Sequence, residues 1–193
     1  MLLRQADKTV RCVLRYKVGS FLVSQAMVMS AVIDDDTLQA QAQALGRYLQ
    51  QQHLSLVTAE SCSGGWIAKL VTDIAGSSAW FDCGVVAYSY EAKQALLGVH
   101  PQTLETHGAV SRECVTEMVS GALANLGGTV AVAVTGIAGP DGGSDDKPVG
   151  TVWIGWKRRG GYATAKLFHF NGDRDAVRRQ TVAKALEGLL ALE

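Results

Sequence analysis

The sequence predicts an α/β fold with three layers, α/β/α, around a mixed, mostly parallel sheet of about five strands. Strand-like and helix-like segments alternate from about residue 36 to residue 135, which is typical of parallel strands joined by helices. Two late strand-like segments joined at Arg159-Gly160-Gly161 form a hairpin signal and add antiparallel strands. The 193 residues, 48% of them apolar and 19% charged, can build one compact core.

The first half of the domain contains three predicted helices and two predicted strands. Apolar residues recur at helical spacing behind an acidic start in 36–52, and again after Gly65 at Ile67, Leu70, Val71 and Ile74. The short apolar run 54–58 suits a buried strand. A second strand is expected at 81–88, followed by a short helix at 91–97.

The second half begins with a helix that Ser111 is expected to cap, because serine at this position can accept a hydrogen bond from the first helical turn. An uninterrupted apolar strand follows at 130–135, and the hairpin strands are expected at 151–157 and 163–170. Asp173 or Asp175 starts the last helix.

The charge balance, the cysteine spacing and the N-terminal segment argue against some classes of protein. Basic and acidic residues balance at 18 each, so no basic excess attracts nucleic acid or anionic lipid. The four cysteines contain no C-x-x-C pair, which favours reduced thiols and a cytoplasmic protein without a metal site. Residues 1–33 are expected to be a poorly ordered leader of unknown role, since their apolar run is too polar for a signal peptide or a membrane span. The domain itself is expected at 34–193.

Two loops could carry chemistry, because ligands of such sheets bind beyond the carboxyl ends of the strands. The first loop is Thr58-Ala59-Glu60-Ser61-Cys62-Ser63-Gly64-Gly65, which ends a strand and opens a helix. Its backbone N–H groups could bind an anion, and a hydroxyl could lie exposed there. Taken alone, the segment favours a simpler interpretation in which Ser61 or Ser63 caps the helix.

The second loop follows the strand at 130–135 and contains Thr135, Gly136, Gly139 and Gly142. Glycines allow the backbone to approach a phosphate or a planar ring closely. The loop matches neither G-x-x-x-x-G-K-[ST] nor G-x-G-x-x-G, and composition does not distinguish a binding loop from a chain reversal.

A serine nucleophile needs a base, and no G-x-S-x-G elbow or histidine triad pattern is present. Lys93 follows a buried-looking strand and opens a helix, and burial at a helix N-terminus would lower its pKa enough for it to act as a base. A solvated lysine is the simpler alternative. Cys62 is a further candidate nucleophile, but no histidine is placed to ionise it.

Six sequence blocks together resemble the CinA C-terminal domain family, and more narrowly its stand-alone members, the nicotinamide-nucleotide amidases. They fall in order across about residues 36–190: T-A-E-S-C-S-G-G, D-I-A-G-S-S-A-W-F, V-A-Y-S-Y-E-A-K, H-G-A-V-S, T-G-I-A-G-P-D-G-G-S-D-D-K-P-V-G-T-V-W and F-N-G-D-R-D-A-V-R-R-Q. Ser63 stands where threonine is common in the family, a change that keeps the hydroxyl.

The resemblance implies hydrolysis of nicotinamide mononucleotide to nicotinic acid mononucleotide and ammonia by a serine and a lysine, with no metal and no cofactor. Carried over by position, Ser61 is the nucleophile and Lys93 its base. Tyr88 is a hydrogen-bonding or proton-relay group, and Ser78 is the alternative attacking hydroxyl.

The resemblance also implies where the nucleotide binds. Thr135, the loop glycines, and Gly64 and Gly65 are expected to contact it, with Arg174 on its phosphate because a guanidinium binds phosphate bidentately. Arg178 and Arg179 are expected to be helix-surface charges. A small-molecule nucleotide is thus the expected partner, in a homo-oligomer that binds neither nucleic acid nor membrane. The competing hypothesis is a non-catalytic nucleotide-binding or protein-interaction module.

Overall fold

The computed structural model describes residues 33–192, and these contain one five-stranded sheet in the order β2-β1-β3-β4-β5. The strands are β1 (Leu56–Glu60), β2 (Phe81–Val86), β3 (Val130–Gly136), β4 (Thr151–Arg158) and β5 (Thr164–His169). β1 pairs in parallel with β2 and with β3, whereas β4 is antiparallel to both β3 and β5. The predicted mixed sheet is confirmed, but its parallel part is limited to β2, β1 and β3 because the hairpin supplies the other two strands.

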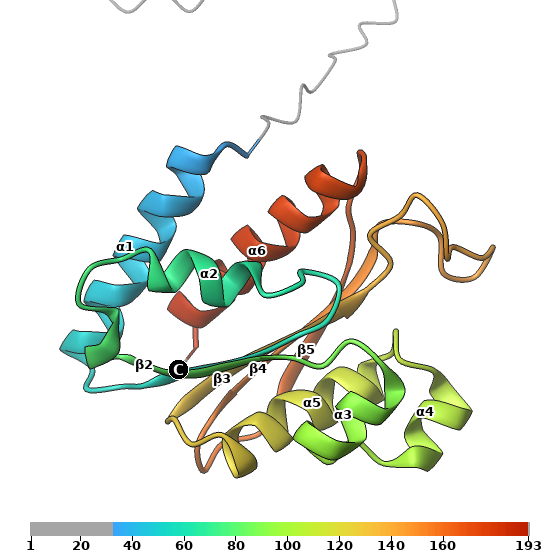
Figure 1. The fold of residues 1–193 in the computed structure, drawn as a ribbon, viewed down its shortest axis with the longest axis horizontal. Helices are drawn as coiled ribbons and strands as arrows, with labels where there is room; N and C mark the ends of the chain where they lie inside the picture. The colour runs from blue at the N-terminus through green and yellow to red at the C-terminus, as the bar shows by residue number, and fades with distance from the viewer. Residues whose placement is uncertain (1–32, 193) are drawn as a thin grey trace, which may run out of the picture. The chain divides into compact units, whose positions relative to one another are not determined.

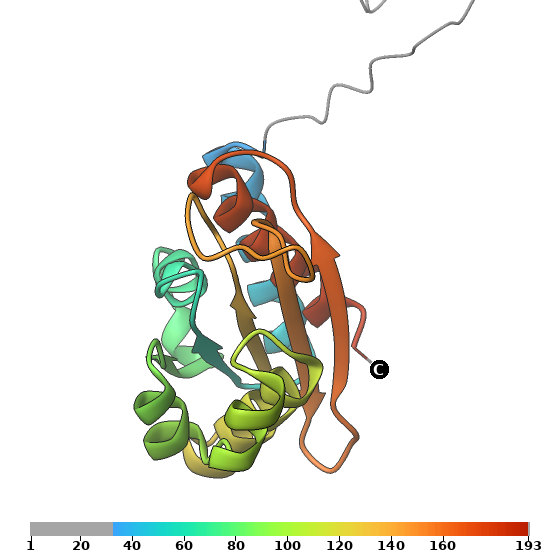
Figure 2. The ribbon, with the colours of Figure 1, turned by 90° about the vertical axis from the view of Figure 1, so that its right-hand side faces the viewer.

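Helices cover both faces of the sheet, which confirms the three-layer fold (Figure 1). One face carries α1 (Asp35–Gln51), α2 (Trp66–Thr72) and α6 (Arg174–Leu190). The other carries α3 (Tyr90–Leu97), α4 (Pro101–His107) and α5 (Arg112–Asn125). In Figure 2 the β4–β5 hairpin closes one edge of the sheet.

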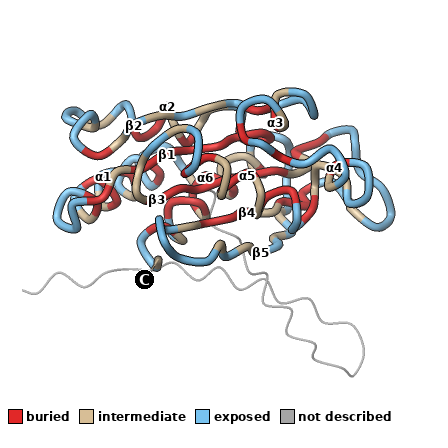
Figure 3. The backbone as a smooth tube through the Cα atoms, turned by 90° about the horizontal axis from the view of Figure 1, so that it is seen from below, coloured by how far each residue is buried: buried red, intermediate tan, exposed pale blue. Residues whose placement is uncertain are grey.

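The core lies in two layers, one on each side of the sheet, and the central strands are its most buried part (Figure 3). Along β3, Val130, Val132 and Val134 face the layer under α1, α2 and α6, while Ala131 and Ala133 face the layer under α5. This alternation follows from the two-residue period of a strand. Because both faces are covered, the central strands read as continuous apolar runs.

Three details differ from the sequence prediction. β1 begins at Leu56 and ends at Glu60, whereas the predicted strand spans 54–58. β2 ends at Val86 rather than at residue 88, because the carbonyls of Ala87 and Tyr88 accept hydrogen bonds from a side chain of α3. The seven-residue α4 was not predicted, since it buries only Leu104 and therefore shows no helical periodicity.

The expected caps are present at two later helices: Ser111 accepts from Cys114 N–H at the start of α5, and Asp173 accepts from Ala176 N–H at the start of α6. The predicted leader lies outside the described residues except for Ile33. Within 33–192, no helix has both the length and the apolar character needed to cross a bilayer.

Candidate active site

Ser61 and Lys93 meet beyond the carboxyl ends of two neighbouring parallel strands. Ser61 follows β1 directly, and Ala87 and Tyr88 follow β2. The chain after β2 turns into α3, whose N-cap Ser89 accepts a hydrogen bond from Ala92 N–H. Lys93 lies in the first turn of α3, so its side chain can reach back toward the end of β1.

The Lys93 ammonium nitrogen has three hydrogen-bond partners. Its Nζ lies 3.0 Å from Ser61 Oγ, 2.7 Å from the Ala87 carbonyl oxygen and 3.1 Å from the Tyr88 carbonyl oxygen. A neutral amine has two N–H groups and one lone pair, and the two carbonyls can accept only N–H groups. In the neutral state the lone pair is therefore left for the Ser61 hydroxyl proton.

Burial shifts Lys93 toward this neutral state. The residue is only 1% exposed, and burial lowers its pKa below the usual lysine value. Negative charge on the Cys114 and Cys62 thiolates would act in the opposite direction, but less strongly. No carboxylate in the described part of the chain forms an ion pair with Lys93.

Cys62 is poorly suited to be the nucleophile. Its side chain is buried, and burial, aided by the negative charge of Glu60, raises the pKa of its thiol to about 12. A thiol with this pKa is almost entirely protonated at neutral pH, and the thiolate is the reactive form. The geometry therefore supports the Ser61 hydroxyl over the Cys62 thiol.

Glu60 fixes the loop that carries Ser61. Its carboxylate is fully buried and accepts hydrogen bonds from Ser63 Oγ at 2.7 Å, Ile67 N at 3.0 Å and Ala68 N at 2.8 Å. The two amides belong to the first turn of α2, where backbone donors otherwise have no partner. Glu60 therefore caps α2, and neither Ser61 nor Ser63 has that role. The Ile67 and Ala68 amides are therefore bound to Glu60 and are not available to an anion.

We expect Glu60→Gln to destabilise the fold by about 2–3 kcal/mol, because an amide directs an NH₂ group at donors that need an acceptor. The midpoint of urea denaturation measures this loss. Glu105→Gln, which changes an exposed carboxylate, is the control and should leave the midpoint unchanged. Equal midpoints for the two variants would contradict the capping role of Glu60.

Gly64 and Gly65 complete the turn, and both have positive φ angles, +64° and +89°. Gly65 is the N-cap position of α2. The structure places both glycines directly after the Ser61–Ser63 segment, and their contact with a substrate stays a prediction.

The structure separates the other two predicted catalytic side chains from the pair. The Tyr88 side chain is 62% exposed, and Lys93 contacts its backbone carbonyl rather than its hydroxyl. Ser78 lies in the short helix η1 (Ser77–Ala79), just before β2 begins. Ser61 follows the opposite end of the adjacent parallel strand, about 15 Å away at ~3.3 Å per strand residue. Ser78 is therefore not part of the Ser61–Lys93 cluster.

The end of β3 and the glycine-rich loop after it are held by contacts within the protein. Thr135 is buried, and its hydroxyl donates to the Ala109 carbonyl at 2.9 Å. A side chain at Gly136 would approach the Thr151 carbonyl oxygen to 2.7 Å, so close packing against β4 explains this glycine. Gly142 lies further along the loop, with a φ angle of +90°.

Arg174, the first residue of α6, reaches this loop. Its Nη1 donates to the Gly139 carbonyl at 2.8 Å, which leaves the other N–H groups of an exposed guanidinium for a ligand. Its contact with a phosphate stays a prediction.

Arg178 was not predicted as a site residue. The sequence suggests a helix-surface charge, but Arg178 Nη2 donates to the Ser63 carbonyl at 2.7 Å, in the loop that carries Ser61. Its four-residue spacing from Arg174 places both side chains on the same face of α6, and this was the available signal. Arg179 does lie at the surface, where it pairs with Asp35 and Asp175.

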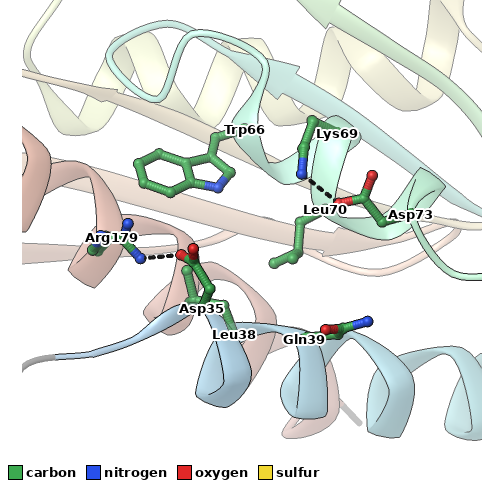
Figure 4. A pocket seen from close by; sticks show the side chains of 8 residues that line it. All are labelled: Asp35, Leu38, Gln39, Trp66, Lys69, Leu70, Asp73 and Arg179. Carbon is green, nitrogen blue, oxygen red and sulfur yellow. Dashed lines mark hydrogen bonds and ion pairs between the residues drawn. The ribbon is translucent and has the colours of Figure 1, made fainter.

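A surface groove of about 430 Å³ lies on the α1–α2–α6 side of the sheet, lined by Asp35, Leu38, Gln39, Trp66, Lys69, Leu70, Asp73 and Arg179 (Figure 4). Its charges pair internally, Arg179 with Asp35 and Lys69 with Asp73. Ser61 and Lys93 are not among its lining residues. Residues 33–192 contain no group of three or more His, Cys, Asp and Glu residues arranged to hold a metal ion.

Comparison with known proteins agrees with the sequence blocks. The nicotinamide-nucleotide amidohydrolase PncC of Escherichia coli K12 is 51% identical over 155 residues, covering 80% of this chain and 94% of the relative. The enzyme of the same name from Pseudomonas putida is 50% identical over 157 residues, covering 81% and 98%. A CinA-like protein of Geobacter sulfurreducens is 45% identical over 175 residues, but the match covers only 40% of that longer chain.

Solved structures give the same result for the fold. The competence/damage inducible protein CihA of Agrobacterium tumefaciens superposes with a TM-score of 0.79 at 45% identity, covering 80% of this chain and 94% of that one. A CinA superfamily protein of Escherichia coli has a TM-score of 0.78 at 37% identity, covering 83% and 92%. The family model for the CinA C-terminal domain matches residues 38–192, and the chain belongs to this family.

Proposed function

We propose that the protein is a nicotinamide-nucleotide amidohydrolase that converts nicotinamide mononucleotide to nicotinic acid mononucleotide and ammonia. The names of the relatives in two bacterial genera supply the substrate. The observation that carries the chemistry is the 3.0 Å contact between Ser61 Oγ and the buried, partly desolvated Lys93 Nζ. A hydroxyl beside a lysine of lowered pKa is an activated nucleophile that needs no histidine.

In the first half-reaction, Ser61 Oγ attacks the carboxamide carbon and its proton passes to the Lys93 lone pair. The resulting tetrahedral intermediate collapses when protonated Lys93 gives this proton to the departing NH₂ group, so that ammonia leaves. The nicotinoyl group is then bound to Ser61 as an ester.

In the second half-reaction, a water molecule replaces ammonia and Lys93 accepts its proton. The hydroxyl attacks the ester carbon, Lys93 returns the proton to Ser61 Oγ, and the free carboxylic acid leaves and ionises. The carbonyls of Ala87 and Tyr88 keep Lys93 Nζ in place through both steps, because each accepts one of its N–H groups.

The test of this function is ammonia release from nicotinamide mononucleotide by the purified protein. A non-catalytic nucleotide-binding module, the competing hypothesis, would bind the nucleotide without releasing ammonia. The buried lysine favours the enzyme, since a binding module gains nothing from burying an amine against a serine hydroxyl at a cost in desolvation.

The phosphate should contribute much of the binding energy. We expect nicotinamide mononucleotide to be hydrolysed at least 10²-fold more efficiently, in kcat/KM, than free nicotinamide, because contacts to a non-reacting group help to position the carboxamide. Arg174→Ala should mainly raise KM, by about 10-fold or more, if the exposed guanidinium beside Gly139 binds the phosphate.

Steady-state kinetics on both substrates measure these effects, with Arg47→Ala, an exposed arginine of α1, as the control. The KM for free nicotinamide should not change in Arg174→Ala, because that substrate has no phosphate. An equal rise of KM for both substrates would show that Arg174 acts on the loop rather than on the phosphate.

A further inference from the structure

The first two turns of α6 hold both loops of the candidate site. Arg174 donates to the Gly139 carbonyl at 2.8 Å, and Arg178 donates to the Ser63 carbonyl at 2.7 Å. Residues four apart lie on the same side of a helix, so one face of α6 contacts the glycine-rich loop and the Ser61 loop together. The Arg174 guanidinium is exposed, whereas Arg178 is partly buried.

Arg178 makes two contacts within the protein, one with the Ser63 carbonyl and one with Trp66. Its guanidinium carbon lies 5.1 Å from the centre of the Trp66 ring, a cation–π contact. Its Nε is buried and has no hydrogen-bond partner within the described residues. Gly64 leaves the space that the guanidinium uses, since a Cβ there would lie 3.2 Å from Arg178 Nη2, and its φ angle of +64° also favours glycine.

Ser63, whose carbonyl Arg178 contacts, is also held by Glu60. Ser63 is fully buried, and its hydroxyl donates to the Glu60 carboxylate at 2.7 Å. The loop is closed by a hydrogen bond from Gly64 N–H to the Ser61 carbonyl at 3.0 Å. Movement of the Ser63 carbonyl would therefore be transmitted through the short Ser61–Gly64 turn to Ser61.

We propose that Arg178 is a positioning residue that keeps Ser61 Oγ within reach of Lys93 by holding the Ser63 carbonyl. The inference rests on the proposed function, in which Ser61 is the nucleophile. Glu60 supports the turn from the sheet and Arg178 supports it from α6, so loss of Arg178 leaves the turn folded but less well placed. A displacement of about 1 Å at a reacting atom can cost on the order of 10²-fold in rate.

The experiment compares Arg178→Gln with Arg179→Gln. The control is matched, because Arg179 is the next residue of α6, carries the same charge and lies 5.0 Å from the centre of the same Trp66 ring. It differs in pairing with Asp35 and Asp175 instead of the Ser61 loop. We expect Arg178→Gln to lower kcat by about 10- to 100-fold with less than a three-fold change in KM, and Arg179→Gln to change neither.

A second readout reports on Ser61 without the substrate. A fluorophosphonate probe bonds through phosphorus to an activated serine Oγ, fluoride leaves and the serine proton passes to the base. The labelling rate of Ser61, measured by intact-mass spectrometry, should fall in Arg178→Gln by about the same factor as kcat. Arg178→Lys keeps one donor for the Ser63 carbonyl and should recover part of the rate.

The outcomes separate this inference from the proposed function. A wild-type protein in which Ser61 is labelled, with the same labelling rate in Arg178→Gln, overturns the positioning role alone. A rise in KM without loss of kcat also overturns it, because Arg178 would then be a substrate ligand. A wild-type protein in which Ser61 is not labelled overturns both the nucleophile and the inference. If Arg178→Gln does not fold, Arg178→Met, which has no donor for the Ser63 carbonyl, takes its place, and equal labelling of folded Arg178→Met and wild type has the same meaning as the first outcome.

Discussion

Replacing Ser61 with alanine removes nearly all turnover, by about 10⁴-fold or more in kcat, while binding of the nucleotide stays measurable. The reason is that the hydroxyl is the atom that attacks, and no other group in the site can form the acyl intermediate. The neighbouring thiol of Cys62 cannot substitute, because its raised pKa keeps it protonated. Ammonia release gives the rate, and calorimetric titration with nicotinamide mononucleotide gives the binding.

Ser78→Ala and Tyr88→Phe are the comparisons for this result. Ser78 precedes β2 at the far end of the sheet from Ser61, so its loss should cost much less than the loss of Ser61, on the order of 10²-fold at most. Tyr88 contacts Lys93 through its backbone carbonyl, which phenylalanine retains, and a partial loss is expected if the hydroxyl relays protons. An inactive Ser78→Ala beside a weakly affected Ser61→Ala would assign the nucleophile to Ser78.

The fold could be predicted because its elements carry local signals. Amphipathic periodicity marks α1 and α5, and the caps Ser111 and Asp173 mark the starts of two helices. α4 could not be found in this way, because a single buried leucine makes no pattern over seven residues. The sequence shows the hairpin but not that β4 also pairs antiparallel with β3, so the sheet is less parallel than the predicted mostly parallel one.

The Ser61–Lys93 pair was predictable only in part. Periodicity and the loop position place each residue near a strand end, but 32 residues separate them in the chain and only the resemblance pairs them. The position of Glu60 illustrates the limit. Its carboxylate is the last side chain of a buried strand, and the sequence does not show that it turns toward the first amides of α2. The sequence therefore favours serine capping over capping by Glu60.

Arg178 shows a different limit. In the sequence it is one of two adjacent arginines in a polar helical turn, and such residues are ordinarily solvated. Only the packing of α6 against α2 distinguishes them, because it directs Arg178 to the Ser63 carbonyl and Arg179 to two carboxylates. A local sequence pattern does not show which of two neighbouring side chains faces another helix. A role that depends on this packing therefore cannot be predicted from the pattern.

Replacing Lys93 should be about as damaging as replacing Ser61. Lys93→Met keeps much of the volume of the side chain but has no lone pair to accept the serine proton, and Lys93→Ala lacks the amine altogether. Lys93→Arg should not rescue turnover, since a guanidinium stays protonated at any working pH. The double variant Ser61→Ala with Lys93→Met should be no slower than either single variant, because the two groups act as a unit.

The wild-type pH profile gives an independent measure of the same group. Lys93 acts as a base only when neutral, so kcat/KM should rise with pH through the lowered pKa of Lys93 and then reach a plateau. Because burial lowers this pKa, the midpoint of the rise should lie below pH 10.5, the ordinary lysine value. Ammonia release at saturating and at low substrate, across a series of buffers of constant ionic strength, measures the profile.

The same profile also distinguishes Lys93 from any other base. In Lys93→Met the residual rate should lose the rising limb, whereas Lys69→Met, which changes an exposed lysine of α2 paired with Asp73, should keep it unchanged. A rising limb at the same pH in wild type and Lys93→Met, or normal turnover in that variant, would show that another group accepts the Ser61 proton.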